Sequence, residues 1–369
     1  MSDMLAGQIH QEFWSGKKVF LTGHTGFKGG WLAVWLASMG AKVVGYSLEP
    51  TASPNLFTVA NIKMQCEHSF IGDIRNFASL KKSMEEANPD IVMHMAAQPL
   101  VRHSYIYPID TYEINLMGTV HVLEAIRRCA DVKAALIVTT DKCYENKEWA
   151  WGYRENEPMG GYDPYSNSKG CAELAVSCYR QSFFHPKDYC KHGVAIASAR
   201  AGNVIGGGDW SEDRLVPDAI RAFESGLPLT IRNPLAIRPW QHVLEPLSGY
   251  LVLTQALYQH GASYNGAWNF GPSDGDARSV QEVVELLIDN WSGDASWRPV
   301  QGSTLHEAHF LKLDCSKARQ ELNWTATWNL EKAIKAVIEW QEKFRDDGNV
   351  CSVMHKQIDE FTRDIANRQ

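Results

Sequence analysis

Tyr165 and Lys169 form the first pair of residues whose spacing suggests chemistry. They bound the segment Tyr165-Ser166-Asn167-Ser168-Lys169, and four residues of helix bring a phenol and an ammonium onto one face. Oxidation of a secondary alcohol by hydride transfer needs a base for the hydroxyl proton, but a tyrosine with its ordinary pKa of about 10 is protonated near neutral pH. An adjacent ammonium lowers that pKa. The same spacing also occurs by chance on exposed helices, so other motifs must support the pair.

A glycine motif gives that support. Thr22-Gly23-His24-Thr25-Gly26-Phe27-Lys28-Gly29 follows an apolar run at 18–21 and precedes a helical pattern. Glycines at 23, 26 and 29 allow a tight turn and bring backbone N–H groups close to a pyrophosphate, which a helix N-terminus favours electrostatically. The position of the motif between a strand and a helix predicts a dinucleotide site.

Two further segments concern the adenosine end of that dinucleotide. Gly72-Asp73-Ile74 is placed to receive an adenine ring, although an aspartate in a plain turn explains it equally well. An acidic residue usually ends the second strand and binds the ribose, whereas this chain offers Ser47, with Glu49 as the nearest charge. We expect NAD, and these residues by themselves leave NADP open.

A third motif, Thr139-Thr140-Asp141-Lys142, closes the apolar run at 134–138. It adds an acid and a second ionisable group, which simple alcohol oxidation does not need. An ordinary cap of a turn or helix explains Asp141 equally well.

The elements that must position these residues alternate between strands and helices. We predict strands at 18–21, 42–46, 90–95, 134–138 and 194–199, and helices at 30–38, 77–86, 108–128 and 165–183. This alternation is typical of a doubly wound α/β fold with a parallel sheet. Beyond about residue 200, prolines, tryptophans and irregular spacing indicate a smaller lobe. We expect a nucleotide-binding domain at 1–200 and a mainly substrate-binding lobe at 201–369, with 240–265 returning to the first domain.

Composition restricts the class of protein. The 369 residues are 44% hydrophobic and 21% charged, with a formal net charge of -7, which is typical of a globular protein with a large core. Binding to nucleic acid or to a membrane surface would need clustered positive charge, so we expect neither. The apolar stretch 31–46 is interrupted by Ser38, Gly40 and Lys42 and is too short for the roughly 20 unbroken apolar residues of a membrane span.

The remaining signals concern the compartment and metals. The eight cysteines show no Cys-x-x-Cys pair and the first residues show no secretory pattern, so we expect reduced thiols and a cytoplasmic protein. His306 and His309 lack a third ligand at suitable spacing, and we expect no metal site.

The motifs together resemble one family over nearly the whole chain. The chain is similar to the extended short-chain dehydrogenases, which have a Rossmann fold, and within them to the nucleotide-sugar 4,6-dehydratases. Sister enzymes acting on dTDP-glucose or GDP-mannose carry Thr-Asp-Glu where this chain has Thr140-Asp141-Lys142, and the members acting on CDP-glucose share the lysine. The other segments carrying the resemblance are Gly23 to Gly29, His94-Met95-Ala96-Ala97 with Ser104, Asn115 with Gly118-Thr119, Tyr165 to Lys169, Arg200 to Trp210, and Arg238 to Val243.

The resemblance implies a set of site residues. The implied catalytic residues are Thr140, Asp141, Lys142, Tyr165 and Lys169. The implied NAD-binding residues are Gly23, Thr25, Gly26, Phe27, Gly29, Asp73, Ile74, Ala96, Ala97, Asn115, Thr139, Tyr165 and Lys169. The implied substrate-binding residues are Ser104, Asn203, Arg214, Leu215, Val216, Arg232, Arg238 and Asn269.

The resemblance also implies a closed reaction cycle on CDP-glucose. Tyr165 takes the C4 hydroxyl proton as hydride passes to NAD, water leaves across C5 and C6, and the hydride returns to C6. Asp141 would then need a raised pKa to protonate the departing hydroxyl. Lys142 would either act as the C5 base in its neutral form, which we favour, or stay charged and stabilise the C4 enolate.

Other functions are also compatible with these motifs. A 4,6-dehydratase or 4-epimerase of another nucleotide sugar would keep Tyr165 and Lys169, and a non-catalytic NAD-binding regulator would keep only the fold. The family further implies a role in deoxysugar biosynthesis of the O-antigen type. It also implies a homodimer formed by the helices at 108–128 and 165–183, or a tetramer of such chains.

Overall fold

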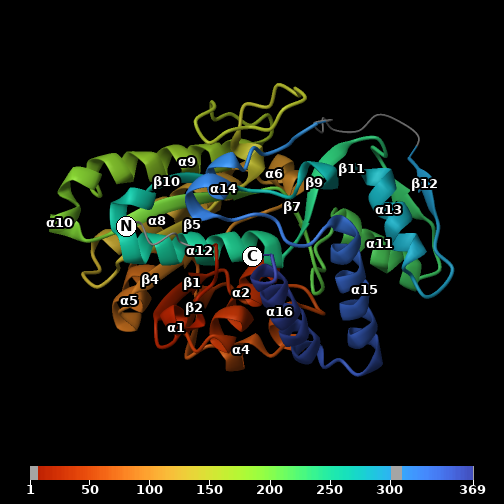
Figure 1. Cartoon of the computed structure of the whole chain (residues 1–369), viewed down its shortest axis with the longest axis horizontal. Helices are drawn as coiled ribbons and strands as arrows, with labels where there is room; N and C mark the ends of the chain where they lie inside the picture. Colours follow the sequence, from red (N-terminus) through yellow and green to blue (C-terminus); the bar gives the residue numbers. More distant parts are fainter. Residues whose placement is uncertain (1–6, 301–309, 369) are drawn as a thin grey trace.

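A seven-stranded parallel sheet forms the centre of the molecule (Figure 1). The computed structural model describes residues 7–300 and 310–368. The strand order is β10-β6-β5-β4-β1-β2-β3. From β1 the chain adds β2 and β3 on one side and β4, β5, β6 and β10 on the other, so the order of the strands reverses between β1 and β4. Proteins with open α/β sheets bind ligands at such a point. The strands are β1 (Lys18–Thr22), β2 (Lys42–Ser47), β3 (His68–Ile71), β4 (Ile91–His94), β5 (Ala134–Val138), β6 (Ala195–Ala201) and β10 (Gly266–Phe270). The predicted doubly wound parallel fold is confirmed.

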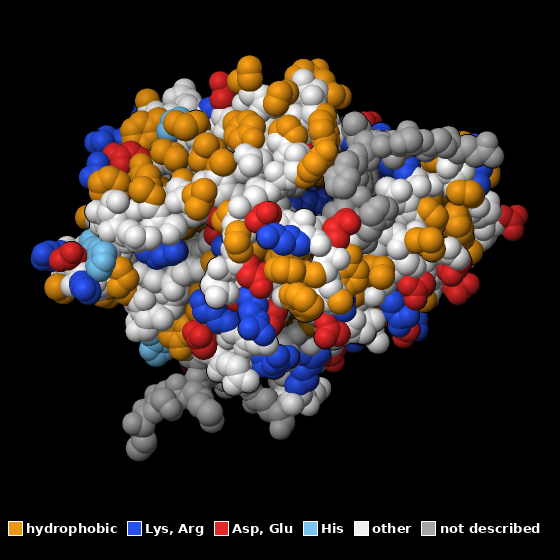
Figure 2. Space-filling view, turned by 90° about the horizontal axis from the view of Figure 1, so that it is seen from above, with side chains coloured by type: hydrophobic (Ala, Val, Ile, Leu, Met, Phe, Trp, Pro, Cys, Tyr) orange, Lys and Arg blue, Asp and Glu red, His pale blue; other side chains and the backbone are white. Residues whose placement is uncertain are grey.

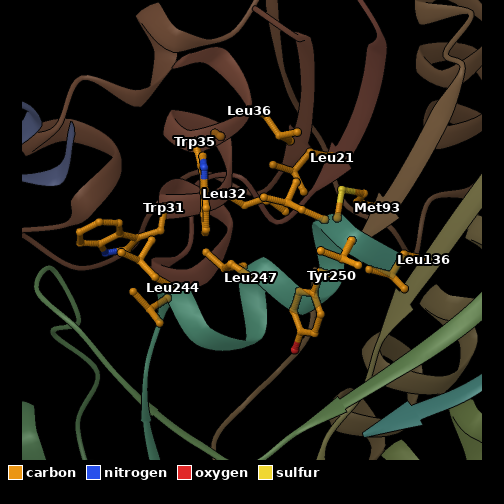
Figure 3. Close-up of a cluster of buried hydrophobic side chains, with 14 of the residues drawn as sticks. Leu21, Trp31, Leu32, Trp35, Leu36, Met93, Leu136, Leu244, Leu247 and Tyr250 are labelled. Carbon is orange, nitrogen blue, oxygen red and sulfur yellow. The ribbon is translucent and has the colours of Figure 1, made fainter. Parts of the chain in front are cut away.

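Helices cover both faces of this sheet, because its central strands are apolar on both sides. One face carries α2 (Phe27–Ser38), α12 (Leu244–His260) and α16 (Val350–Ala366). Figure 3 shows Trp31, Trp35 and Leu247 packed together in the core of this face. The other face carries α5 (Phe77–Ala87), α8 (Gly118–Arg127) and α9 (Pro164–Ser182).

The helix α12 is buried on all sides from Leu244 to Leu257, including Glu245, Ser248 and Thr254. A helix without a polar face belongs inside a core, and α12 contacts β5, β6 and α2. The helix α12 therefore packs on the large sheet, whereas residues 240–242, which we also expected there, belong to a strand of the smaller sheet described below. The chain after residue 200 also supplies β10, which pairs in parallel with β6, for example Trp268 with Ala199. Neither β10 nor β3 is among the five strands that we predicted from the sequence.

A second, smaller group of elements lies beside the large sheet. It contains a three-stranded sheet, β11-β9-β7, and a two-stranded sheet, β12-β8, and their shared core includes Val216, Trp240 and Leu287. Its strands are β7 (Asn203–Ile205), β8 (Leu229–Ile231), β9 (Ile237–His242), β11 (Ala277–Ser279) and β12 (Trp297–Pro299), and its helices are α11 (Leu215–Glu224), α13 (Val280–Asp289) and α15 (Leu330–Asp346).

Short helices complete the fold. The predicted helix at 108–128 is continuous but contains a π-helical turn, Glu113–Met117, between α7 and α8. No helix among the residues with described positions is long and apolar enough to cross a membrane. The remaining helices are α1 (Gln11–Trp14), α3 (Leu56–Val59), α4 (Ile62–Gln65), α6 (Val101–Ile106), α7 (Pro108–Tyr112), α10 (Tyr189–His192) and α14 (Ser316–Leu322).

Candidate active site

A cavity of about 910 Å³ lies where the carboxyl ends of β4, β5 and β6 meet the smaller group of elements. Met95 and Ala97 come from the segment after β4, Thr140 follows β5, and Gly202 follows β6. The smaller group contributes α11, β8 and β9 to the opposite wall. Ligands of open α/β sheets bind at this edge, so the topology alone brings the separate motifs to one place.

The glycine turn after β1 is packed so tightly that side chains are excluded. Gly23 has a φ of +82°, and a Cβ on Gly29 would lie 2.0 Å from the carbonyl oxygen of Gly23. Gly26 caps α2 and leaves the first N–H groups of that helix without intrahelical partners. Such a helix N-terminus suits a pyrophosphate. The Thr25 hydroxyl lies 2.8 Å from the Ser47 hydroxyl at the end of β2.

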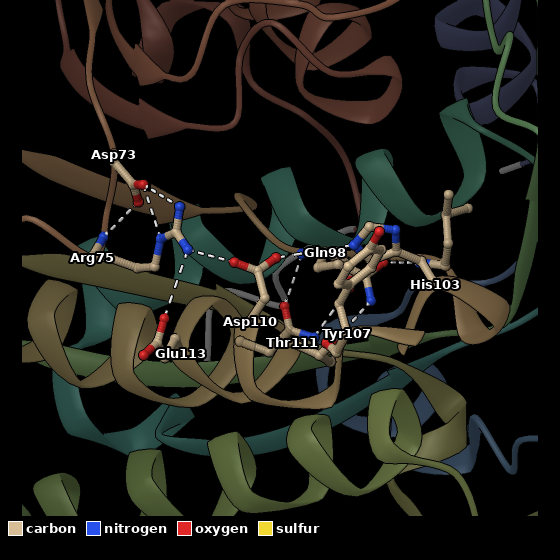
Figure 4. A network of polar contacts seen from close by, with 10 residues as sticks. Asp73, Arg75, Gln98, His103, Tyr107, Asp110, Thr111 and Glu113 are labelled. Carbon is tan, nitrogen blue, oxygen red and sulfur yellow. Dashed lines mark hydrogen bonds and ion pairs between the residues drawn. The ribbon is translucent and has the colours of Figure 1, made fainter. Parts of the chain in front are cut away.

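Asp73, which we predicted at the adenine end, is held by Arg75 (Figure 4). Its Oδ2 accepts hydrogen bonds from Arg75 Nε at 2.9 Å and Nη2 at 2.6 Å. Arg75 Nη1 also donates to Asp110 Oδ1 on α7 at 2.5 Å. Figure 4 shows Asp110 on the same helix as Thr111, whose hydroxyl accepts from Gln98 Nε2 at 2.9 Å. The loop after β3 is therefore tied to α7.

Tyr165 lies on the first turn of α9, which begins at Pro164 and is capped by Asp163, whose Oδ1 accepts from Ser166 N at 2.9 Å. The side chain faces the cavity and is 8% exposed. Burial raises the pKa of Tyr165 to about 12, against the lowering effects of a hydrogen bond with Thr140 and of the Arg214 charge. Lys169, which we expected to lower this pKa, donates to the carbonyl oxygen of Val138 at 3.3 Å. The protein by itself thus keeps the phenol protonated.

Lys169 is buried one turn further along α9. Burial lowers the pKa of Lys169 to about 8, and the carboxylate of Glu173 opposes this shift. Glu173 is itself paired inside the protein with Arg200, Nη2 to Oε2 at 2.9 Å, and accepts from the Thr139 hydroxyl at 2.5 Å. This buried ion pair connects α9 to β6 and to the residue that precedes Thr140.

Asp141 lies in a turn directly after β5 and is 1% exposed. Its Oδ1 accepts from the Thr140 hydroxyl at 3.0 Å, and its Oδ2 has no hydrogen-bond partner among the described residues. Burial raises the pKa of Asp141, as the predicted role of a proton donor requires. Lys142 follows it and lines the cavity.

Lys28 is a residue of the cavity that the sequence analysis did not select. It belongs to the glycine motif and lies on the first turn of α2, with Nζ 3.4 Å from the hydroxyl of Tyr250. Burial, followed by the charges of Arg214 and Lys169, lowers the pKa of Lys28 to about 7. The sequence did contain a signal for Lys28, because a charged side chain within a glycine motif expected to bind a ligand lies close to that ligand.

Most of the predicted substrate-binding residues line the cavity. Arg214 Nη1 donates to Asp209 Oδ2 at 2.8 Å, and the carboxylate of Asp209 is only 6% exposed. The predicted residues that line the cavity are Asn203, Arg214, Leu215, Val216, Arg232 and Arg238.

Eleven predicted site residues do not line this cavity. Eight belong to the predicted cofactor set, and the other three are the polar side chains of Ser104, Asn269 and Asn115. The eight are Gly23, Thr25, Gly26, Phe27, Gly29, Asp73, Ile74 and Ala96. The Ser104 hydroxyl, which we expected to bind substrate, donates to the carbonyl oxygen of Val101 at 2.6 Å. Asn269, with the same expected role, is fully buried, and its Nδ2 donates to the carbonyl oxygen of Tyr153 at 2.8 Å. Asn115, expected at the cofactor, lies in the π-helical turn, where its side chain bonds both backbone groups of Gln98. These three polar side chains bond backbone groups of the protein instead, and for Asn269 that partner lies 116 positions away in the chain. A pattern of residue types does not reveal such bonds.

Metal ligation finds no support in the part of the chain that the structure describes. No group of three or more histidine, cysteine, aspartate or glutamate side chains is arranged there to hold an ion. His306 and His309, from which we predicted no metal site, lie outside the described residues.

Comparisons with known proteins identify the family of this chain. The family model described as GDP-mannose 4,6 dehydratase matches residues 20–337. A CDP-glucose 4,6-dehydratase of Salmonella typhimurium is 55% identical over 93% of this chain and 96% of its own length. A dTDP-glucose 4,6-dehydratase of Xanthomonas campestris is 25% identical over 87% of this chain and 92% of its own.

Solved structures show the same fold at lower identity. A dTDP-glucose 4,6-dehydratase of Bacillus anthracis in complex with NAD superposes with a TM-score of 0.72 at 21% identity, covering 88% of this chain and 96% of that one. A dTDP-glucose 4,6-dehydratase of Streptomyces venezuelae, with NAD and TYD bound, gives 0.74 at 21% identity, covering 89% and 97%. The breadth of the family match and the 55% identity lead to one assignment: this chain belongs to the GDP-mannose 4,6-dehydratase family.

Proposed function

We propose that this protein is an NAD-dependent dehydratase that converts CDP-glucose to CDP-4-keto-6-deoxyglucose. The observation that carries the proposal is the group at the end of β5. There, Asp141 is buried with one oxygen unpartnered and shares the cavity with Tyr165 and Lys142. Alcohol oxidation needs a base alone, whereas loss of water also needs a proton donor. The 55% identity to a CDP-glucose 4,6-dehydratase supports cytidine as the base of the nucleotide.

The glycine turn fits NAD. Gly23 and Gly29 leave no room for side chains, so the backbone itself forms the surface that a pyrophosphate would meet. Bound there, NAD would supply a hydride acceptor for C4 and the same hydride for C6. Gly23, Thr25, Gly26, Phe27 and Gly29 would hold its phosphates.

Tyr165 would take the proton of the C4 hydroxyl. Burial raises the pKa of the Tyr165 phenol to about 12 in the protein alone, so a neighbouring positive charge must favour its ionised form before it can act as a base. Lys169 on the same helix face, and Thr140 through its hydrogen bond, are the groups placed to orient the phenol.

Asp141 and Lys142 would serve the loss of water. Burial raises the pKa of Asp141, so this carboxyl can hold a proton and give it to the departing C6 hydroxyl. Lys142 is the neighbouring nitrogen base in the cavity, and we propose that it takes the C5 proton as a neutral amine. If Lys142 stays charged, it would stabilise the C4 enolate, and another base would take that proton.

The diphosphate would bind at the wall formed by the smaller group of elements. Arg214 and Arg238 line that wall with Asn203, and guanidinium groups bind phosphate oxygens through parallel N–H donors. Arg214 is already oriented by its bond to the buried Asp209.

The test is incubation of the purified protein with CDP-glucose and NAD. We expect a product lighter by one water, identified by mass spectrometry and NMR as the 4-keto-6-deoxy sugar. The matched controls are UDP-glucose, dTDP-glucose and GDP-mannose, each of which should react far more slowly. A 4-hydroxyl product with inverted configuration would indicate an epimerase, and no reaction with CDP-glucose would refute the proposal.

The assembly we propose is a homodimer, with a tetramer made of two such dimers as the larger alternative. Large apolar side chains are exposed along α6 to α9, and Figure 2 shows hydrophobic side chains gathered on part of the face seen from above. Light scattering of the wild type and of Leu174→Glu, expected to be a monomer, tests this surface. The exposed apolar residues of this segment include Ile106, Ile109, Met117, Leu174 and Phe183.

The setting we propose is deoxysugar biosynthesis of the O-antigen type in the cytoplasm. The eight cysteines are all unpaired, which is typical of a reducing compartment. Cell fractionation of the producing organism tests the compartment, and deletion of the gene followed by sugar analysis of the surface polysaccharide tests the pathway.

A further inference from the structure

Asp213 lies between two arginines that come from different parts of the fold. Its Oδ1 accepts from Arg102 Nη1 on α6 at 3.0 Å and lies 3.5 Å from Arg232 Nη1, in the residue that follows β8. All three residues line the cavity. One carboxylate oxygen therefore links the nucleotide-binding half to the smaller group of elements.

The Asp213 contact differs from the other arginine–aspartate pair of the cavity. Asp209, the partner of Arg214, is 6% exposed and also accepts from Ser211 N at 3.0 Å, so it is a fixed part of the protein. The side chain of Asp213 is 40% exposed, and among the described residues it makes side-chain hydrogen bonds only to Arg102 and Arg232. Its backbone has a φ of +59°, in the left-handed region that non-glycine residues seldom adopt.

These features allow another anion to replace the Asp213 carboxylate at the two arginines. An exposed ion pair contributes little because water solvates both partners well, so a competing anion can replace it. The substrate of the proposed function carries a diphosphate, which has more negative charge and more acceptor oxygens than a carboxylate, and guanidinium groups bind phosphate bidentately. A diphosphate is also long enough to contact two arginines at once.

We propose that Asp213 occupies the binding position of the substrate diphosphate until the substrate binds. It holds Arg102 and Arg232 in place before substrate binds, and the diphosphate then displaces it and bonds to both guanidinium groups. This inference rests on the proposed function only in requiring a nucleoside diphosphate sugar. It makes Arg102, on the short helix α6, a substrate-binding residue beyond the arginines already expected.

Calorimetric titration with CDP tests the exchange. Asp213→Asn removes the competing anion, so we expect CDP to bind about three- to fivefold more tightly, the range expected from loss of an exposed ion pair. Arg102→Gln removes a charged donor to the phosphates and should weaken CDP binding about tenfold or more. In the double variant the gain from Asp213→Asn should shrink, because the two changes act on one interaction.

A charge-matched control separates the bond from the general field of the cavity. Glu145 lines the same cavity and lies near Lys147, 3.7 Å between charged atoms, with no arginine partner among its described contacts. Glu145→Gln removes the same charge and should change CDP affinity less than Asp213→Asn. An equal gain from Glu145→Gln, weaker binding by Asp213→Asn, or a full gain retained in the Arg102→Gln background would each overturn the proposal.

The binding readout keeps this inference apart from the proposed function. A wild-type protein that binds CDP but does not dehydrate CDP-glucose contradicts the proposed function, and the same series of variants still decides the role of Asp213. If the wild type binds UDP or dTDP instead of CDP, the base assignment fails, and the titrations are repeated with the diphosphate that binds.

Discussion

Replacement of Lys169 by Met is expected to abolish catalysis while stabilising the folded protein. Lys169 is 6% exposed, and burial lowers its pKa from the ordinary 10.5 to about 8. The folded state therefore binds this proton more weakly than the unfolded state does, and keeping the ammonium charged costs free energy of folding. Methionine has a similar length and carries no charge to desolvate.

The magnitude follows from the two pKa values. Lowering the Lys169 pKa by about 2.5 reduces the free energy of unfolding by about 3 kcal/mol below pH 8, since a pKa difference of one corresponds to 1.36 kcal/mol. Loss of the 3.3 Å hydrogen bond from Lys169 to the Val138 carbonyl oxygen lowers the free energy of unfolding of the variant by about 1 kcal/mol. We therefore expect Lys169→Met to raise the free energy of unfolding by about 2 kcal/mol at pH 7. Because the unfolded state holds more protons between pH 8 and 10.5, the cost falls as pH rises through that window, and the gain should shrink towards zero.

Urea denaturation of the nucleotide-free protein at pH 7 and pH 9.5 measures both quantities. Lys82→Met, at an exposed lysine of α5, is the matched control and should change stability by less than about 0.5 kcal/mol at either pH. If Lys169→Met destabilises the protein at pH 7, or if its effect does not depend on pH, the argument from burial is wrong. Near-normal dehydration by this variant would contradict its place in the site.

Three further predictions concern the reaction. Tyr165→Phe should lower the rate about 10²- to 10⁴-fold while NAD still binds by calorimetry, since it removes the base alone; near-normal activity would assign the base elsewhere. Asp141→Asn and Lys142→Met should oxidise the substrate once and stall, giving a single-turnover absorbance of reduced nicotinamide with little 4-keto-6-deoxy product; normal water loss would refute this division of labour. The wild type should accumulate no reduced nicotinamide during turnover, and continuous accumulation in step with product would make it an ordinary dehydrogenase.

The amino-acid sequence by itself determined the layered fold and the chemistry at the strand ends. Apolar runs followed by helical patterns require a parallel sheet, because such strands must be covered on both faces. The glycine spacing at 23 to 29 and the Tyr165–Lys169 pair act through local backbone geometry, so their residue types are readable before folding. Asp141 lies three residues after the end of β5, and its position at the sheet edge could likewise be inferred.

Only the tertiary structure decided which polar groups are buried and what they bond. Asn269 and Ser104 have the residue types of a binding site but satisfy backbone groups inside the protein, as buried polar atoms must. Lys28, on the first turn of α2, lines the cavity, and burial lowers its pKa. The contact of Asp213 with Arg102 joins residues 111 positions apart. Desolvation and long-range pairing depend on neighbours that the chain supplies only after folding, so no local pattern encodes them.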